Sequence, residues 1–295
     1  MHAPTPSWAA VIVNYNAGEH LRGCIASVLA DDSAGPVEVV VVDNASTDDS
    51  LATIADLDAM VVHAGANLGL AAAANLGIAA TTAPWVAVIN PDTLLRRGSA
   101  ARLVGRLQHE PDLGAVGPRI DNPDGSVYPS ARREPNLGVA VGHTLAGAWW
   151  PKNPFTRRYR ELDANPALAR DVDWISGAGM WLARAALDDV GGWDERYFMF
   201  MEDVDLGRRL RERGWRVAYE PDAALVHEEG VSRAHHPYRM IAVHHRAVFR
   251  YADRWWDGPR RVLLPGAAAL LTVRALVTMA RRAFGSRRRR PQVCG

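Results

Sequence analysis

Apolar runs and amphipathic segments alternate along the first hundred residues. The apolar runs predict four strands, at 8–16, 37–46, 60–65 and 85–92. Helical spacing of apolar residues and N-cap residues predict three intervening helices, at 19–30, 46–57 and 70–81. Runs that are apolar at nearly every position are typical of strands covered on both faces. This alternation through short connections indicates a Rossmann-like α/β fold with a mostly parallel sheet.

The rest of the chain divides into an irregular middle and a helical end. The middle is rich in Pro, Gly and Trp, and its last part predicts a helix from Met201 followed by a strand–turn–strand pattern ending at His227. Helical spacing continues at 237–256, and 262–280 is mostly apolar. We therefore expect one domain at 1–228, with halves at about 8–115 and 116–228, and a helical, basic region at 229–295.

Composition narrows the classes of function. The 295 residues are 48% hydrophobic and 23% charged, with a net charge of +1, which is ordinary for a globular protein and does not favour nucleic acid as a partner. The two cysteines, Cys24 and Cys294, lie far apart and predict a reduced compartment without a disulfide framework. The first apolar run is too short for a signal peptide.

Polar residues end three of the four predicted strands. Ligands of open α/β sheets bind outside the carboxyl ends of the strands, so these residues indicate a binding site. Each is also a common turn or cap residue, and that alternative stays open for any one of them. The residues are Asn14 and Asn16 after the first strand, Asp43 after the second, and Asn90 and Asp92 after the fourth.

The sequence lacks both common phosphate-binding loops. No GxGxxG follows the first strand, and GxxxxGK[ST] is absent. If phosphates bind, a divalent cation must therefore neutralise much of their charge. Mg²⁺ prefers carboxylates together with substrate phosphate oxygens, which makes Asp92 a candidate cation ligand.

Two further candidates lie late in the chain. Glu202 and Asp203 follow the apolar stretch YFMFM, which would partly desolvate them; a desolvated carboxylate has a raised pKa and can act as a base. The alternative is a favourable interaction with the helix dipole. His227 is either a metal ligand or a structural histidine.

Taken together, the motifs resemble the inverting glycosyltransferases of family two, which have the GT-A fold. The motifs are VIVNYN, VVVVDNASTDDS, ANLGLAAAANLG, INPDT, SGAGMWLAR and FMFMEDVDLGRRLRERGW, in that order, over about residues 8 to 230. Within the family they are most similar to bacterial rhamnosyltransferases that act on N-acetylglucosaminyl-diphospho-polyprenol. The resemblance implies a GT-A catalytic domain followed by a helical C-terminal tail.

The resemblance implies a metal site. NPD stands where many relatives have Asp-x-Asp, so Asp92 matches the metal-binding carboxylate. Asn90 stands in place of the first aspartate, and its side-chain carbonyl oxygen would contact the ribose or the cation. His227 matches a histidine that completes metal coordination in several relatives. The implied cofactor is Mg²⁺ or Mn²⁺.

The resemblance also implies a nucleotide-sugar site. Asp43 matches the residue that contacts the nucleotide base, and Asn14 and Asn16 border the same pocket. The segment from Asn67 to Asn75 matches the part that packs beside the ribose and the diphosphate.

The implied reaction is a single displacement with Asp203 as the base and Glu202 as the alternative base. The implied donor is dTDP-L-rhamnose, and the acceptor is a polyprenyl-diphosphate-linked or other glycolipid glycan. UDP-galactose, UDP-glucose and UDP-GlcNAc are alternative donors. A non-catalytic sugar-nucleotide-binding or glycan-binding domain is disfavoured by the intact Asp92, Asp203 and His227. A nucleotidyltransferase is disfavoured because the sequence lacks a glycine- and lysine-rich phosphate loop near the first strand.

The C-terminal region indicates contact with a membrane. Segment 262–280 has about the length of a membrane span, but it contains Pro265 and Arg274, and a central arginine costs about 2.5–3.5 kcal/mol on insertion scales. Six arginines follow at 281–290 and would bind anionic headgroups. We expect a cytoplasmic protein, peripheral at the inner face of the cell membrane; a spanning helix and a soluble helix packed on the catalytic domain are the alternatives.

Overall fold

Two units make up the protein in the computed structural model, which describes residues 7–134, 139, 150, 153–228 and 237–288. The first unit comprises Met1–Phe198 and Glu202–Ser232, and the second comprises Met199–Met201 and Arg233–Gly295. The domain boundaries expected from the sequence stay a prediction. Cys294 and the last two arginines of the C-terminal cluster lie outside the described residues.

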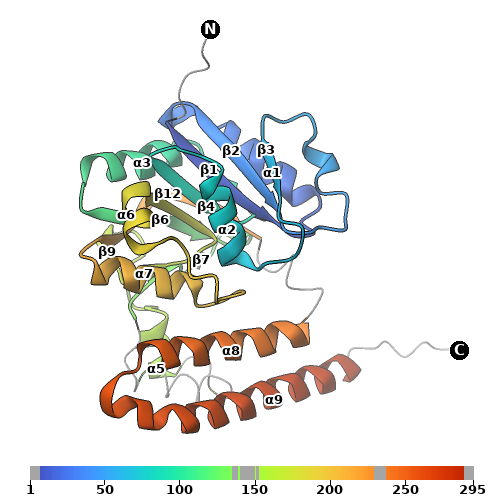
Figure 1. Ribbon diagram of the computed structural model, residues 1–295, viewed down its shortest axis with the longest axis vertical. Coiled ribbons are helices and arrows are strands. Elements are labelled where there is room, and N and C mark those ends of the chain that lie inside the picture. The colour runs from blue at the N-terminus through green and yellow to red at the C-terminus, as the bar shows by residue number, and fades with distance from the viewer. Residues whose placement is uncertain (1–6, 135–138, 140–149, 151–152, 229–236, 289–295) are drawn as a thin grey trace, which may run out of the picture. The chain divides into compact units, whose positions relative to one another are not determined.

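A ten-stranded sheet forms the centre of the first unit (Figure 1). Its main path runs β3–β2–β1–β4–β11–β6–β12–β5, with β7 beside β6 and β9 beside β12. Six of these eight strands share one direction, because β11 pairs antiparallel with both β4 and β6, and β5 antiparallel with β12. The strands are β1 (Trp8–Asn14), β2 (Val37–Asp43), β3 (Met60–His63), β4 (Trp85–Ile89), β5 (Thr93–Leu95), β6 (Leu113–Asp121), β7 (Val127–Tyr128), β9 (Arg170–Asp171), β11 (Gly179–Ala183) and β12 (Arg216–His227). A separate two-stranded sheet pairs β8 (Ala131–Arg132) with β10 (Trp174–Ile175).

The four predicted N-terminal strands are confirmed, and the apolar runs account for them. Every residue of β1 is buried, and so are the last five of β2. β1 pairs in parallel with β2 on one side and with β4 on the other. The carboxyl ends of these strands therefore lie along one edge of the sheet, where the polar residues of the sequence follow them.

Helices cover both faces of this sheet. Figure 1 shows α2 and α6 in front of the sheet and α3 behind it. The approach of α2 is close, since a Cβ on Gly77 would lie 2.3 Å from a side-chain atom of Val11 and 2.9 Å from one of Val42. The α-helices of this unit are α1 (Glu19–Leu29), α2 (Leu70–Ala79), α3 (Ser99–His109), α5 (Pro154–Tyr159), α6 (Arg184–Val190) and α7 (Glu202–Glu212), and its 3₁₀ helices are η1 (Asp32–Ala34) and η2 (Ala52–Ile54).

Two predictions about individual elements are wrong. The helix expected at 46–57 is a loop with only the short η2, because the N-cap-type residues there bond to the β1 edge instead: Ser46 Oγ accepts from the Asn16 N–H at 3.1 Å, and Asp48 Oδ2 from the Gly18 N–H at 2.9 Å. The expected strand–turn–strand at 217–227 is the single strand β12. Its register against β6 shifts between Glu220 and Ala224, and this irregularity accommodates Pro221 within a strand.

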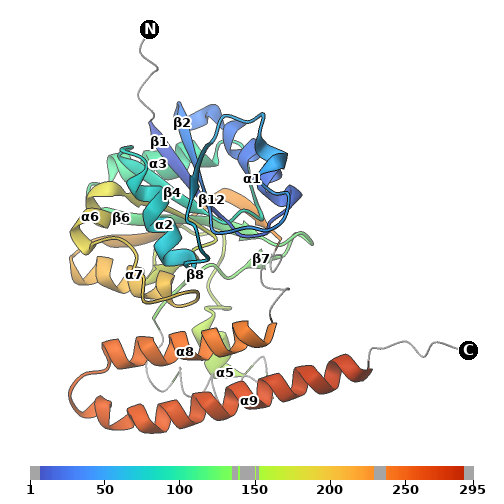
Figure 2. The same ribbon diagram turned by 45° about the vertical axis from the view of Figure 1, so that its right-hand side comes forward.

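The second unit contains a helical hairpin. Figures 1 and 2 show α8 (Pro237–Trp255) and α9 (Leu264–Arg288) side by side and antiparallel, joined through η3 (Gly258–Leu263). Leu271 of α9 is buried, whereas the side chains of Val273 and Leu276 on the same helix are 58% and 61% exposed. The predicted helices of this region are confirmed.

Candidate active site

The ends of β1 and β2 are joined by buried polar side chains. The Asn14 amide nitrogen lies 3.3 Å from Asp43 Oδ1, 3.0 Å from Ser46 Oγ and 2.8 Å from Ser50 Oγ. Asn14 and Asp43 are buried, so these contacts hold the Asp43 carboxylate in a fixed orientation. His63 Nδ1, on the neighbouring strand, lies 3.6 Å from the second carboxylate oxygen of Asp43. This geometry presents a fixed carboxylate acceptor at the sheet edge, as recognition of a base N–H requires.

Asn16 shapes the loop that follows β1. Its φ is 53°, in the left-handed region that asparagine tolerates better than most residues. Its side-chain Oδ1 accepts a hydrogen bond from the Thr47 N–H at 2.7 Å. Asn16 therefore connects the loop after β1 to the loop after β2. Asn16 thus lies at the edge of the polar side chains around Asn14 and Asp43.

Asn44 directly follows Asp43 at the end of β2 and bonds to the loop before α2. Its amide donates to Asn67 Oδ1 at 3.1 Å, and its Oδ1 accepts from the Leu68 N–H at 2.8 Å. Asn67 Oδ1 also accepts from the Gly69 N–H at 3.1 Å. The loop before α2 is thereby fixed to the end of β2, and Asn67 lies beside the Asp43 group.

Asn75 has a different environment from the other predicted asparagines. Its amide donates to the Trp193 carbonyl and to Glu195 Oε1, both at 2.9 Å, and its Oδ1 accepts from the Trp193 N–H at 2.9 Å. A Cβ on Gly192 would lie 2.8 Å from Asn75 Oδ1, so a glycine is needed there. Asn75 therefore fixes α2 to the segment between α6 and α7, and its contact with the nucleotide sugar stays a prediction.

The loop after β4 meets the end of β12. Residue pairing sets His227 opposite Thr93, and His227 Nε2 lies 3.1 Å from Asp92 Oδ1. The Asn90 amide nitrogen lies 3.4 Å from the same ring nitrogen. Both Asp92 and His227 are buried. The structure thus brings together all three residues predicted from the NPD motif and the end of the last strand.

The Asp92–His227 pair suits a divalent cation. Asp92 Oδ1 and His227 Nε2 lie 3.1 Å apart, and a carboxylate oxygen and an imidazole nitrogen are both metal-ligand types. The other ring nitrogen, His227 Nδ1, is buried without a hydrogen-bond partner among the described residues. Within the described ranges no three His, Cys, Asp or Glu side chains converge on one point. Two protein ligands leave coordination positions for water and substrate phosphate oxygens, the arrangement typical of Mg²⁺ sites.

Glu202 and Asp203 begin α7 in a desolvated environment. Asp203 Oδ2 accepts from the Gly177 N–H at 3.2 Å, and Oδ1 accepts from the Val204 N–H at 2.8 Å. Burial raises the pKa of the Asp203 carboxyl, partly opposed by these two N–H donors and by the charge of Arg132. Burial and then the charge of Asp203 raise the pKa of Glu202 well above its ordinary value.

The two acids differ in access. Glu202 is 4% exposed, and its Oε2 has no hydrogen-bond partner in the described part of the chain. Asp203 is half-buried and held by two backbone donors, so it is the acid that a substrate can reach in a fixed geometry. Gly177 was not predicted as a site residue, because a backbone N–H leaves no signal in the sequence.

Comparison with known proteins decides the family. Residues 9–172 match the family described as Glycosyl transferase family 2, and residues 160–284 match Glycosyl transferase family group 2. The chain is also 40% identical over 292 residues to N-acetylglucosaminyl-diphospho-decaprenol L-rhamnosyltransferase of Mycobacterium tuberculosis, a match that covers 92% of this chain and 94% of the relative. The chain is a family-two glycosyltransferase.

Other relatives of this glycosyltransferase are more distant. It is 33% identical over 209 residues to the pre-mycofactocin glycosyltransferase of M. tuberculosis, which covers 70% of this chain and 38% of that protein. Among solved structures it resembles a mannosyltransferase from Pyrobaculum calidifontis in complex with GDP-Man and Mn²⁺, with a TM-score of 0.57, 19% identity and coverage of 94% of this chain and 75% of the other. Residues 1–349 of S. aureus TarS give a TM-score of 0.55 at 15% identity, covering 94% and 73%. These likenesses confirm the GT-A fold expected for this glycosyltransferase.

Proposed function

We propose that this enzyme transfers L-rhamnose from dTDP-L-rhamnose to an N-acetylglucosaminyl-diphospho-polyprenol acceptor, with inversion at the anomeric carbon. The observation that carries the proposal is the likeness to the mycobacterial rhamnosyltransferase over nearly the full length of both chains. A likeness of that extent covers both the donor half and the acceptor half of the catalytic domain.

Asp203 is the base in this proposal. Its carboxylate takes the proton from the acceptor hydroxyl as the oxygen attacks the anomeric carbon from the face opposite the nucleotide. The C–O bond to the acceptor forms while the bond to the diphosphate breaks, so no covalent enzyme intermediate is needed. Burial supports the role, because it raises the pKa of Asp203 and so makes the carboxylate a better proton acceptor. The Gly177 and Val204 N–H groups orient the carboxylate.

In the same proposal, the nucleotide sugar is held by the residues at the carboxyl ends of β1, β2 and β4. Asp43, fixed by Asn14, accepts from the base of the nucleotide, and Asn16, Asn67 and the Asn75 segment border the donor. Asp92 and His227 hold the divalent cation, Mg²⁺ or Mn²⁺, with Asn90 beside them. When bound, such a cation supplies charge neutralisation to a departing diphosphate.

We further propose that the helical hairpin attaches the enzyme to the inner face of the membrane. Among the described residues one segment, Gly258–Ala283, is long and apolar enough to cross a membrane. An interfacial position agrees better with the structure, because α9 packs one face on α8, exposes Val273 and Leu276, and carries Arg274 near its middle. Arg281 and Arg282 are exposed near its end, where anionic headgroups would bind them.

The activity is tested by incubating the purified enzyme, Mn²⁺ and an N-acetylglucosaminyl-diphospho-lipid with separate nucleotide sugars. The donors are dTDP-L-rhamnose, UDP-glucose, UDP-galactose and UDP-GlcNAc. We expect acceptor-dependent release of nucleoside diphosphate with dTDP-L-rhamnose, and a product with inverted anomeric configuration by NMR. Turnover with one of the UDP-sugars in place of dTDP-L-rhamnose would overturn the donor assignment. If none of the four donors supported turnover, the proposed function would be overturned.

Membrane attachment is tested at exposed positions of α9. Leu276→Glu combined with Val273→Glu should reduce sedimentation with anionic liposomes, whereas Met60→Glu, at a residue 46% exposed on β3, should not. Salt should weaken binding of the unmodified enzyme, because charge attraction is screened over a Debye length of about 8–10 Å. Unchanged liposome binding in the double variant would contradict the proposal, and resistance to salt and alkaline carbonate would indicate a spanning helix.

A further inference from the structure

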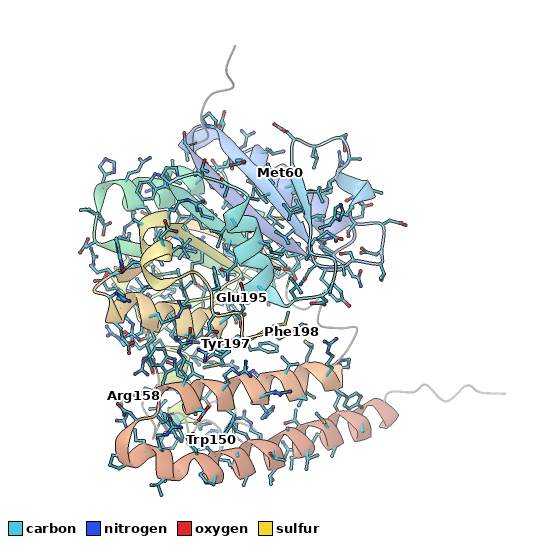
Figure 3. All side chains as sticks on the ribbon, viewed as in Figure 1. Met60, Trp150, Arg158, Glu195, Tyr197 and Phe198 are labelled. Carbon is cyan, nitrogen blue, oxygen red and sulfur yellow. The ribbon has the colours of Figure 1, made fainter. Side chains whose placement is uncertain are left out.

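Arg132 is a basic residue close to the start of α7. The segment that contains Glu195 and Tyr197 leads into α7 (Figure 3), and Asp203 stands in the first turn of that helix. Burial raises the pKa of the Asp203 carboxyl, and the positive charge of Arg132 opposes that rise. Arg132 and Asp203 both belong to the catalytic unit, so their proximity is a property of that unit by itself.

The small sheet of β8 and β10 brings Arg132 to this place. Arg132 is paired opposite Trp174 in that sheet. Gly177, two residues beyond the end of β10, donates its N–H to Asp203 Oδ2 at 3.2 Å. Helix α7 packs closely on the same strand, since a Cβ on Gly207 would lie 2.8 Å from a side-chain atom of Trp174. The strand beside Arg132 therefore contacts α7 and continues into the backbone donor of the base.

A second contact holds the segment after β8 against α7. The Glu134 carboxylate accepts a hydrogen bond from Arg208 at 2.8 Å and another from Arg211 at 2.9 Å, and both arginines lie on α7. The chain at Arg132 is thus paired with β10, and two residues later it is bound to α7. These two contacts fix the backbone of Arg132 beside the helix that carries the base.

The Arg132 guanidinium has a fixed orientation. Its Cζ lies 4.9 Å from the centre of the Trp174 ring and 5.7 Å from that of the Tyr128 ring, within the range of cation–π contacts. Nε donates to the Pro129 carbonyl at 2.7 Å, and Nη2 donates to the Tyr128 hydroxyl at 3.4 Å. The side chain is half-buried, whereas Trp174 is buried. A guanidinium held in one plane is suited to phosphate groups, whose oxygens it can bind in pairs.

The acceptor of the proposed reaction creates a need for a cation here. Its reacting hydroxyl and its diphosphate belong to the same N-acetylglucosamine, so the diphosphate comes within the width of a sugar ring of the base. Asp203 must be ionised to accept a proton, and its charge and that of the diphosphate repel each other in a desolvated environment. A guanidinium whose charge acts on Asp203 offsets this repulsion.

We propose that Arg132 is a specificity-determining residue, whose guanidinium binds the diphosphate of the acceptor while Asp203 contacts the reacting hydroxyl. Arg132 thereby lets the enzyme distinguish a diphosphate-linked sugar from the same sugar without the charged group. This inference rests on the proposed function, because it requires a diphosphate-linked acceptor.

The test uses the full-length enzyme and two soluble acceptors at a pH above the acid limb of kcat. One acceptor is N-acetylglucosaminyl-diphosphate with a short alkyl chain, and the other is the same alkyl N-acetylglucosaminide without the diphosphate. The measurements are kcat/KM for each acceptor, donor Kd, and Ki for an alkyl diphosphate that competes with the acceptor. Arg133→Gln is the matched control, because Arg133 is the adjacent arginine and its Nε lies 3.5 Å from Glu161 instead.

We expect Arg132→Gln to lower kcat/KM for the diphosphate acceptor about 10- to 100-fold, mainly through KM, because hydrogen bonds between charged groups are the strong ones. Ki for the alkyl diphosphate should rise by a similar factor. Turnover of the uncharged acceptor and donor Kd should change little. Arg132→Lys should lose less than Arg132→Gln, because lysine keeps the charge but not the planar pair of donors. Arg133→Gln should behave as wild type.

The pH profile supplies a second readout. Among the described residues, the charged groups that face Asp203 are Glu202 from α7 and Arg132 from β8. Because Arg132 opposes the rise that burial causes in the pKa of Asp203, its removal should move the acid limb of kcat to higher pH with the uncharged acceptor. A merely structural role predicts the reverse, since a loosened site admits water and lowers that pKa.

Each outcome decides between the claims. If the wild type does not prefer the diphosphate acceptor, or if Arg132→Gln keeps that preference and the wild-type Ki, the inference is overturned while glycosyl transfer stands. A loss of donor affinity in Arg132→Gln with an unchanged acceptor preference also overturns it, because the arginine then binds the donor. A wild type that uses neither acceptor overturns the proposed function itself. If Arg132→Gln fails to fold, the same measurements on Arg132→Lys decide.

Discussion

Two acidic sites at the carboxyl edge of this glycosyltransferase contain the same kind of side chain in opposite environments. Asp92 is buried, and its Oδ1 lies 3.1 Å from Nε2 of His227, an imidazole nitrogen of the type that binds metals. Glu202 and Asp203 are desolvated beside each other, and burial raises the pKa of both. Asp203 finds its hydrogen bonds in backbone N–H groups, and one oxygen of Glu202 finds none among the described residues.

The difference shows how surroundings assign chemistry to a carboxylate. A carboxylate next to an imidazole nitrogen has the ligand types that bind a metal cation. A carboxylate that lacks such a partner and is removed from water is arranged to accept a proton. In the proposed mechanism, the first environment serves the leaving group at the end of β4 and the second serves the acceptor at the start of α7.

The largest expected effect is at the proton-accepting site. Asp203→Asn should lower kcat by about 10²–10⁴-fold, the usual contribution of general base catalysis, because the amide keeps the shape but cannot take the proton. Donor affinity, measured by titration calorimetry, should change little. A variant that kept more than about a tenth of wild-type kcat in single-turnover assays would show that the base is another group.

A smaller loss is expected at the charge-holding site, and it should depend on the cation. Asp92→Ala or His227→Ala should weaken donor binding by more than about tenfold in the presence of Mn²⁺, since even residues that only support metal ligands contribute about 10–100-fold to metal affinity. In excess EDTA the variants and the wild type should bind the donor alike. Full wild-type activity in EDTA would remove the metal role of both residues.

The smallest effect concerns the interaction within the acid pair. Glu202→Gln should leave the acid limb of the kcat profile near its wild-type pH. Burial and then the charge of Asp203 raise the pKa of Glu202 well above its ordinary value, so Glu202 is neutral while Asp203 ionises, and the amide imitates that neutral state. An acid limb moved clearly to lower pH would show that Glu202 is charged when Asp203 titrates, and complete loss of activity would make Glu202 the better candidate for the base.

The sequence predicts the donor half of this fold well, because its information is local. The buried strands are continuous apolar runs, and five predicted site residues lie at or just after their carboxyl ends: Asn14, Asn16, Asp43, Asn90 and Asp92. The predicted pairing of Asp92 with His227 needed the family resemblance, because the two residues are far apart in sequence and meet only through the pairing of β5 with β12.

Other features could not be predicted because their causes are tertiary. Ser46 and Asp48 are good N-cap residues, but their side chains accept hydrogen bonds from the loop after β1 instead, which the sequence does not predict. Asn75 fits a nucleotide-binding segment by position, yet its amide bonds to Trp193. The left-handed backbone at Phe200 contradicts the preference of that residue, and it is typical of functional sites that local preference fails there.

The pH dependence of kcat for the unmodified enzyme, at saturating donor, acceptor and Mn²⁺, tests the central claim most directly. Asp203 must be ionised to accept a proton, so kcat rises with pH through the pKa of the acid pair. Because burial raises that pKa, we predict an acid limb centred above about 3.9, the ordinary value for aspartate, and absent from the residual activity of Asp203→Asn. An acid limb centred at or below that ordinary value would contradict the assignment of a desolvated carboxylate as the base.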